Sequence, residues 1–319
     1  MKIAFVGKGG SGKTTLAALF ARHLAEHGRP VLAIDADINQ HLAVALGVPE
    51  HEATALPALG DHIEEIKQYL RGDNPRIGST DAMVKTTPPG AGSRLVDITG
   101  HNPIYQRSAR DHEGIRLLVT GPFTEDDLGV ACYHSKVGAV ELLLNHLVDG
   151  AGEYVVVDMT AGADSFASGL FTRFDITFCV CEPTWRGVSV FRQYMGYAAE
   201  FGVRVAVVGN KMEDDQDAAF LRDALGVDPV ACLSRSAYVR ATEQSLSVPG
   251  GLEATNRAAL AQLQQVVDTI EKDWPTYTRQ AVEFHLRNAN AWANARVGID
   301  LSTQVDPDFV LGPGALTGS

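Results

Sequence analysis

Cysteines and long apolar runs are scarce in this chain of 319 residues. Its four cysteines are too few for a disulfide framework at this length, so we expect a reducing compartment. No stretch approaches the ~18 consecutive apolar residues of a membrane span. The apolar run at the N-terminus, residues 3–6, is too short for a signal peptide. These absences predict a soluble, cytoplasmic protein.

Positive charge is scarce as well. The chain has 27 lysines and arginines against 39 aspartates and glutamates, which gives a formal net charge of −12. A surface of this sign repels nucleic-acid backbones and anionic lipids, so we expect neither nucleic acid nor a membrane as a partner. Hydrophobic residues make up 45% of the chain, which is enough for a sizeable core. Composition alone does not indicate the function, which therefore has to be inferred from sequence motifs.

Short apolar segments alternate with helical patterns along most of the chain. Two buried strands, 3–6 and 31–35, enclose a glycine-rich loop and a helix from 14 to about 27, which makes a βαβ unit. Further strands and helices are expected at 115–121, 135–150 (helix), 153–159, 175–183, 187–202 (helix) and 203–211. This alternation predicts an α/β fold, a three-layer sandwich with a mostly parallel central sheet flanked by helices.

The loop after the first strand, residues 7–15, reads GKGGSGKTT. It satisfies the P-loop pattern G-x-x-x-x-G-K-[ST] between a strand and a helix, the context that the motif requires. Glycines let backbone N–H groups converge on phosphates, and we expect Lys13 to reach the β- and γ-phosphates and the Thr14 hydroxyl to bind Mg²⁺. The residues expected to bind the nucleotide here are Gly9, Gly10, Ser11, Gly12, Lys13, Thr14 and Thr15.

Two aspartates end the strand at 31–35 and its following turn. Asp35 and Asp37 lie at the carboxyl edge of the predicted sheet, where ligands of α/β proteins bind. We predict that Asp37 orients the attacking water and that Asp35 supports Mg²⁺ or its waters. A solvated strand end without such a role is the alternative.

Two later strands also end in polar residues. The strand at 153–159 has the form of a Walker B strand, so Asp158 is expected to hold Mg²⁺ and the small-residue loop 160–162 to sense the γ-phosphate. Asn210 and Lys211 follow another strand. An Asn amide can donate and accept at once, which suits the adenine edge of ATP. A residue that only favours a turn is the alternative for Asn210.

Residues 8–15, followed by the D-x-D at 35–37, resemble the deviant-Walker-A ATPases. This P-loop NTPase class of SIMIBI type includes MinD and ParA proteins, the nitrogenase iron protein, tail-anchored-protein targeting ATPases and metal-centre maturation factors. In that family the extra lysine crosses a dimer interface to the partner's phosphates. The resemblance therefore implies a homodimer in the ATP state, with Lys8 in a catalytic role. A solvated surface lysine is the alternative.

The resemblance is fullest to the maturation ATPases that supply nickel to carbon monoxide dehydrogenase, and it covers about residues 1–270. It is carried by segments 131–144, 154–162 and 181–184. Where that family has Cys-x-Cys, this chain has Cys132-Tyr133-His134. One Cys and one His from each of two subunits would suit Zn²⁺ and tolerate Ni²⁺ at a dimer interface. The resemblance implies a metalloenzyme client.

Two other cysteines, Cys179 and Cys181, also spell Cys-x-Cys. They lie in a strand that we expect to be buried on both faces, so small apolar packing is the better interpretation. A [4Fe–4S] cluster shared across a dimer would need two suitable cysteines per subunit, and Cys132 lacks an obvious second.

The sequence is predicted to divide into a main domain and a C-terminal extension. Residues 1–274 are predicted to form the P-loop ATPase domain, with an insertion at about 51–114. Within that insertion, KTTPPGAGSR (85–94) is expected to be exposed. Residues 275–319 are predicted to form a C-terminal helical extension and a flexible tail.

Together these features predict a Mg²⁺-dependent ATPase that works as a dimeric maturation factor or metallochaperone. A positioning switch of the MinD/ParA type, without metal delivery, is the main alternative. A P-loop kinase or an amide-forming synthetase is a more remote one, against which the two-lysine loop weighs.

Overall fold

The computed structural model describes residues 1–122, 133–162, 166, 168–244 and 251–316. An eight-stranded sheet runs through the molecule in the order β10-β9-β8-β1-β7-β2-β5-β4, and β3 pairs with β6 separately. The strands are β1 (Lys2–Gly7), β2 (Val31–Ala36), β3 (Val96–Asp97), β4 (Arg110–His112), β5 (Ile115–Val119), β6 (Leu147–Val148), β7 (Tyr154–Met159), β8 (Ile176–Cys181), β9 (Val205–Met212) and β10 (Ala231–Ser234). In the large sheet the pairing of β4 with β5 is antiparallel and the other pairings are parallel.

Helices connect the strands. The α-helices are α1 (Lys13–Glu26), α2 (Leu42–Ala45), α3 (Glu50–Ala53), α4 (Ile63–Arg71), α5 (Pro103–Ser108), α6 (Tyr133–His146), α7 (Trp185–Ala198), α8 (Asp215–Leu225), α9 (Ala237–Glu243), α10 (Ala254–Asp268), α11 (Trp274–Asn288), α12 (Asn294–Val297) and α13 (Pro313–Leu316). Short 3₁₀ segments are η1 (Leu59–His62), η2 (Thr80–Ala82), η5 (Gly169–Thr172), η6 (Ala199–Phe201) and η8 (Leu301–Gln304), and η7 (Ala289–Ala293) is a π-helical turn. Within the described residues, no helix is long and apolar enough to cross a membrane.

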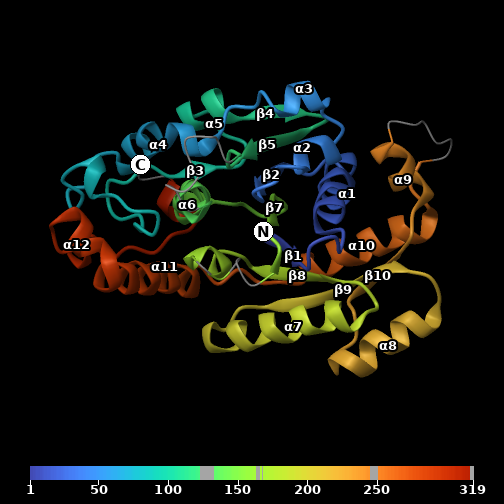
Figure 1. Ribbon diagram of the computed structural model, residues 1–319. Coiled ribbons are helices and arrows are strands. Elements are labelled where there is room, and N and C mark those ends of the chain that lie inside the picture. Colours follow the sequence, from blue (N-terminus) through green and yellow to red (C-terminus); the bar gives the residue numbers. More distant parts are fainter. Residues whose placement is uncertain (123–132, 163–165, 167, 245–250, 317–319) are drawn as a thin grey trace.

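The sheet separates two hydrophobic cores, because successive residues of a strand face opposite sides of the sheet. Val155 and Val157 of β7 belong to the core with α6, α7 and α8, whereas Val156 belongs to the core with α1 and α10. Figure 1 shows these helices as layers around the sheet. The predicted α/β sandwich with a mostly parallel sheet is confirmed.

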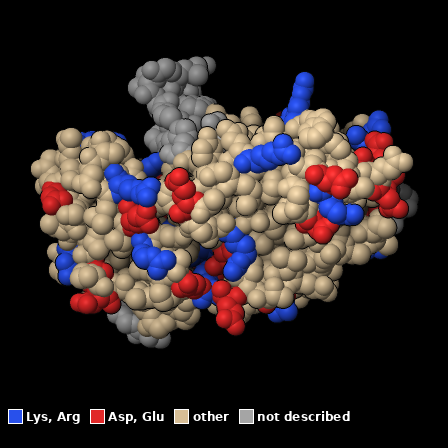
Figure 2. Space-filling view, turned by 90° about the horizontal axis from the view of Figure 1, so that it is seen from below, with Lys and Arg blue, Asp and Glu red and all other residues tan. Residues whose placement is uncertain are grey.

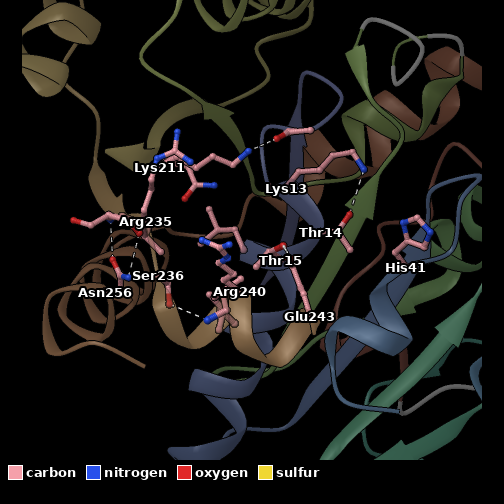
Figure 3. A pocket seen from close by; sticks show the side chains of 18 of the residues that line it. Lys13, Thr14, Thr15, His41, Lys211, Arg235, Ser236, Arg240, Glu243 and Asn256 are labelled. Carbon is pink, nitrogen blue, oxygen red and sulfur yellow. Dashed lines mark hydrogen bonds between the residues drawn. The ribbon is translucent and has the colours of Figure 1, made fainter. Parts of the chain in front are cut away.

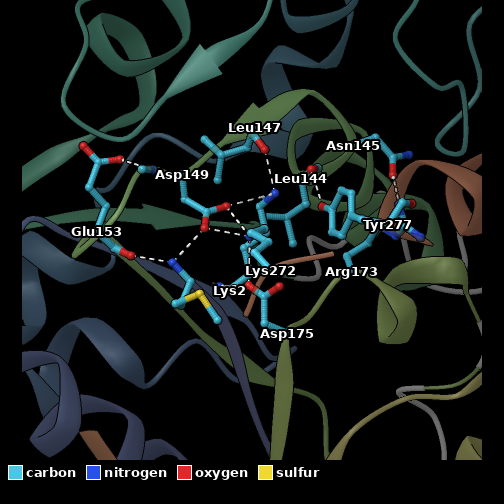
Figure 4. A network of polar contacts seen from close by, with 12 residues as sticks. Lys2, Leu144, Asn145, Leu147, Asp149, Glu153, Arg173, Asp175, Lys272 and Tyr277 are labelled. Atoms are coloured by element: carbon cyan, nitrogen blue, oxygen red, sulfur yellow. Dashed lines mark hydrogen bonds and ion pairs between the residues drawn. The ribbon is translucent and has the colours of Figure 1, made fainter. Parts of the chain in front are cut away.

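A buried network of charges lies at the amino end of β1, away from the P-loop (Figure 4). Lys2 Nζ donates to the carbonyl of Leu147 at 2.6 Å and lies 3.3 Å from Asp149 Oδ1. Lys272 Nζ lies 2.5 Å from the same Asp149 oxygen and 2.8 Å from Asp175 Oδ2. Through Asp149, this network links Lys2 at the start of β1 to Lys272, which lies between α10 and α11.

The insertion and the C-terminal extension pack on each other, which differs from the sequence-based expectation. The stretch 85–94, which we predicted to be exposed, is exposed only at 91, 92 and 94, whereas residues 86–90 are buried. Thr87 within it donates to Gln304 Oε1 at 3.4 Å. The predicted flexible tail is packed as far as it is described: Leu301 and Leu311 are buried. The contacts join residues about 200 positions apart, so local composition gave no sign of them.

Charged side chains of both signs are interspersed on the face seen in Figure 2. Lysines and arginines stand beside aspartates and glutamates across that face. Exposed pairs in the structure include Arg107 with Glu65 at 2.8 Å and Arg235 with Glu213 at 2.9 Å. Exposed pairs of this kind contribute little to stability.

Candidate nucleotide site

The P-loop follows β1, which lies at the centre of the sheet between β7 and β8. Gly12 has a left-handed backbone with φ of 90°, and a Cβ there would lie 2.3 Å from Asn210 Nδ2. A larger residue would therefore clash as well as strain the loop. Gly9 and Gly10 have open space where a Cβ would stand, so their backbone can approach a ligand closely.

A cavity of about 690 Å³ opens in front of this loop (Figure 3). Most of the residues predicted to bind the nucleotide or to act on it line the cavity: Gly9, Gly10, Gly12, Lys13, Thr14, Thr15, Asp37, Asn210 and Lys211. The opposite wall is formed by β10, α9 and the start of α10. Lys13 and the helix N-terminus supply the positive potential that phosphates need.

Lys13 is held by carboxylates. Its Nζ donates to Asp37 Oδ2 and lies 3.5 Å from Asp158 Oδ1. Burial opposes the charge of Lys13, but Asp158 and Asp37 outweigh that effect and raise its pKa. The structure therefore brings together the lysine, the carboxylate predicted to orient water and the carboxylate predicted to hold Mg²⁺.

Asp158 and Thr14 have the chemistry of a Mg²⁺ site. Thr14 Oγ1 donates to Asp158 Oδ2 at 2.6 Å. The other carboxylate oxygen, Asp158 Oδ1, is buried and accepts no hydrogen bond. Burial raises the pKa of Asp158 to about 6, although Lys13 and Thr14 lower it. Because Mg²⁺ prefers oxygen ligands, a carboxylate oxygen that accepts no hydrogen bond and lies beside a threonine hydroxyl fits this ion, although Lys13 Nζ is 3.5 Å away.

Asp35 positions the turn that carries Asp37. It is fully buried, and its two oxygens accept the backbone N–H groups of Asp37 at 3.1 Å and Leu42 at 2.8 Å. Burial and the charge of Asp158 raise the pKa of Asp35 to about 8, against the effect of these donors. Since both oxygens already bind the backbone, a role in supporting Mg²⁺ stays a prediction.

Asn210 and Lys211 bind the P-loop backbone. Asn210 Nδ2 donates to the carbonyl of Ser11 at 2.7 Å, and Lys211 Nζ donates to that of Gly10 at 2.5 Å. Lys211 has φ of 59°, a left-handed conformation that is strained for a lysine and often found at functional sites. Both residues thus brace the loop, and their contact with adenine stays a prediction.

Lys8 lies beside the cavity but is not part of its lining. Its side chain is 35% exposed, and its Nζ lies 3.9 Å from Glu182 Oε2. The other oxygen of Glu182 pairs with Lys211 at 2.6 Å. No role was predicted for Glu182. Its position directly after the apolar strand that ends at Cys181 was the signal that could have placed it at the ligand edge of the sheet.

The far wall of the cavity was also missed. Arg235, Ser236, Arg240 and Glu243 line it together with Asn256. Figure 3 shows them opposite the P-loop, and Thr15 Oγ1 lies 3.5 Å from Glu243 Oε1. These residues follow β10, so the rule that parallel strands end at the ligand edge could have found them.

The cysteine predictions have different outcomes. Cys132 lies outside the described residues, and His134 is placed only as part of the backbone of α6. The described part of the chain contains no group of three metal-binding side chains. Cys179 and Cys181 are buried in β8 with their Sγ atoms 3.8 Å apart. The Cys181 thiol and burial raise the pKa of Cys179, which agrees with packing.

A P-loop after the central strand of a parallel sheet, with Lys13, Thr14 and Asp158 at one point, defines a P-loop nucleotide-binding protein. The chain belongs to the CobQ/CobB/MinD/ParA nucleotide binding domain family, which matches residues 3–273. The resemblance to the MinD/ParA class is thereby confirmed.

Curated relatives cover about two thirds of the chain. The carbon monoxide dehydrogenase accessory protein CooC of Rhodospirillum rubrum is 31% identical over 224 residues, which is 70% of this chain and 79% of the relative. An uncharacterized ATP-binding protein of Methanocaldococcus jannaschii is 30% identical over 70% of this chain and 80% of its own.

Solved structures share the fold at low identity. MinD of Pyrococcus horikoshii, complexed with Mg-ADP, superposes with a TM-score of 0.54 at 17% identity, covering 84% of this chain and 97% of that one. A chain of the MinC:MinD cell division protein complex of Aquifex aeolicus has a TM-score of 0.53 at 17% identity, covering 85% of this chain and 98% of that one.

Proposed function

We propose that this protein is an ATP-hydrolysing, Mg²⁺-dependent switch that dimerises with ATP and serves the maturation of a metalloenzyme. The observation that carries the ATPase half is the position of Lys13 between Asp37 and Asp158, with Thr14 beside them. The relationship to CooC, named an accessory protein of carbon monoxide dehydrogenase, supports the maturation half. We expect the protein to act in the cytoplasm.

Hydrolysis would begin with an exchange of partners at Lys13. When phosphates enter the cavity, Lys13 turns from Asp37 to the β- and γ-phosphate oxygens. Asp37 then has a free carboxylate oxygen with which to orient the attacking water. Mg²⁺, held by Thr14 and Asp158, would neutralise charge on the phosphates. The backbone N–H groups of residues 9–15 complete the cradle.

Lys8 would complete the site of a second subunit. Because it does not line the cavity of its own subunit, its charge is available to a facing copy. In a dimer, Lys8 would exchange Glu182 for the partner's phosphates and act in the manner of an arginine finger. This coupling would make dimerisation depend on ATP.

The test compares wild type with Lys8→Ala by size-exclusion chromatography with light scattering, in ADP and in a non-hydrolysable ATP analogue. We expect wild type to dimerise in the analogue alone. Lys8→Ala should stay monomeric and hydrolyse ATP about 10³-fold more slowly, with nucleotide affinity little changed. Lys67→Ala, which removes a lysine paired with Glu64 on α4, is the control. A Lys8 variant that dimerises and hydrolyses normally contradicts the proposal.

The metal half of the proposal concerns Cys132 and His134. One Cys and one His from each of two subunits would make a four-ligand site for Zn²⁺ or Ni²⁺. Equilibrium dialysis with either metal and the ATP analogue should give about one metal per dimer for wild type, since two subunits share it. Cys132→Ala should abolish that metal, with Cys232→Ala as the control. Equal stoichiometry in wild type and Cys132→Ala would mean that these residues deliver no metal.

A further inference from the structure

The turn after β2 is closed by the buried carboxylate of Asp35. One of its oxygens accepts the backbone N–H of Asp37 at 3.1 Å, and the other accepts that of Leu42 at 2.8 Å. Because both amide groups bind the same carboxylate, the two ends of the stretch 37–42 lie close together. Asp35 therefore holds His41, the residue before Leu42, near Asp37.

Alternate residues of this turn, Asp37, Asn39 and His41, line the nucleotide cavity. Gln40 between them has φ of 51°, a left-handed conformation that costs free energy in a residue with a side chain. Such strain persists where the surrounding structure imposes it, and it is frequent at functional sites. The turn is thus a defined part of the cavity wall.

His41 differs from the other two residues of that wall in its hydrogen bonds. Asp37 accepts from Lys13 and from the backbone and side-chain nitrogens of Asn39. Within the described residues, the imidazole of His41 makes no hydrogen bond or ion pair. His41 is exposed, and an imidazole always carries at least one N–H donor. It therefore offers the cavity a donor that the fold itself does not use.

The position of His41 indicates which part of a nucleotide it would meet. Figure 3 shows His41 at the end of the cavity nearer to Thr14 than to Lys211. Thr14 is the residue assigned to Mg²⁺, which bridges the β- and γ-phosphates in P-loop enzymes. Asp37, which Asp35 holds near His41, is the residue assigned to the attacking water. Both assignments put the γ-phosphate at the end of the cavity where His41 lies.

His41 also borders a second cavity, which is the competing explanation for its unused donor. That cavity, of about 430 Å³, shares Thr15 and Glu243 with the nucleotide cavity and extends to Arg22 and Glu50. All three alternate residues of the turn line the nucleotide cavity, whereas His41 alone of the three lines the second one. The nucleotide is therefore the better supported ligand.

We propose that His41 binds the terminal phosphate of ATP, with an imidazole N–H donating to a γ-phosphate oxygen. This inference rests on the proposed nucleotide switch. ADP lacks the γ-phosphate, so His41 would favour ATP over ADP in a site whose P-loop binds both. A hydrogen bond to a charged group changes affinity by about tenfold or more. His41 would thus be a residue by which the switch distinguishes its two nucleotides.

The experiment is calorimetric titration of the full chain with Mg²⁺ and either ADP or a non-hydrolysable ATP analogue. His41→Ala should raise the Kd of the analogue about tenfold or more and change the Kd of ADP by less than about twofold. His41→Gln, which keeps a side-chain N–H donor, should recover part of the lost affinity. His51→Ala, at an exposed position of α3, is the control and should leave both Kd values unchanged.

The outcomes separate the inference from the proposed function. If wild type binds the analogue and His41→Ala binds it equally well, the inference alone is wrong. Equal losses of ADP and analogue affinity in His41→Ala also contradict it, because ADP has no γ-phosphate. If wild type does not bind the analogue, the proposed function fails and the inference fails with it. Circular dichroism should show that His41→Ala is folded, since exposed substitutions have small effects on stability.

Discussion

At the scale of single residues, Lys13 connects the two carboxylates of the candidate site, Asp37 and Asp158. It occupies Asp37 Oδ2, while Asp37 Oδ1 accepts from the backbone and side-chain nitrogens of Asn39. Both oxygens of Asp37 therefore already accept hydrogen bonds. If Asp37 orients the attacking water, as we propose, Lys13 has to leave Asp37 Oδ2 before it can do so.

Replacing Asp37 by Asn tests this role. Asp37→Asn should slow phosphate release by about 10²–10⁴-fold, the usual contribution of a positioned base. Nucleotide affinity should stay equal or rise, because a neutral amide holds Lys13 less strongly than a carboxylate does. Phosphate release and the binding of a fluorescent ATP analogue measure the two effects. Asp61→Asn, on the exposed surface of η1, is the control, and a rate within threefold of wild type would remove Asp37 from the mechanism.

The sequence predicted the residues of the site whose contacts are local. Residues 9–15 form one turn and the start of one helix, so their spacing alone predicts a phosphate-binding loop. The contact of Glu182 with Lys8 depends on the order of strands in the sheet, which spacing does not reveal. Positions 35 and 37 would point the same way in a continuous strand, but β2 ends at Ala36. Only the structure shows that Asp35 binds the backbone with both oxygens while Asp37 accepts from Lys13.

At the scale of elements, the buried parallel strands were the most predictable parts of the fold. Apolar runs such as those of β7 and β9 fill both cores, and their composition is a local property. The three-residue strand β4 and the two-residue strands β3 and β6 carry too few side chains for any pattern. The burial of residues 86–90 was unpredictable for another reason, since Thr87 has its partner, Gln304, in the C-terminal extension.

Gln304 tests how firmly the extension holds the insertion. Its Nε2 donates to the carbonyl of Ala82 at 2.8 Å, and its Oε1 accepts from Thr87. Gln304→Ala leaves these buried groups unpaired, which should lower the free energy of unfolding by about 1–3 kcal/mol. Calorimetry should show a Tm lower by about 2–4 °C per kcal/mol.

The matched control for that change is Gln106→Ala, at an exposed position of α5. It removes the same side chain without unpairing a buried group and should leave Tm within about 1 °C of wild type, since exposed substitutions have small effects. An unchanged Tm for Gln304→Ala would mean that the extension is held mainly by its apolar contacts, such as that of Leu301 with Val84.

At the scale of the whole molecule, the family domain and the C-terminal extension form one packed body. The family match ends at residue 273, directly before α11, yet Tyr277 of α11 donates to the carbonyl of Leu144 in α6 at 2.7 Å. Arg173 is fully buried between them and donates to the carbonyl of Tyr277 at 3.0 Å. The extension therefore supports α6, the helix that begins beside the candidate metal ligands.

The two charged clusters at opposite ends of β1 differ in their access to dissolved ions. Lys2 and Asp149 are buried and the Lys272 side chain is only 10% exposed, so ionic strength screens their attraction little. Lys8 and Glu182 are partly exposed to solvent. Dissolved ions therefore screen the attraction between them, since the Debye length is about 8 Å at physiological salt. Added salt should therefore leave the network of Lys2, Asp149 and Lys272 intact but weaken the ion pair of Lys8 with Glu182. If Lys8 has to leave Glu182 for the proposed dimer to form, the salt concentration would then influence how readily two subunits associate.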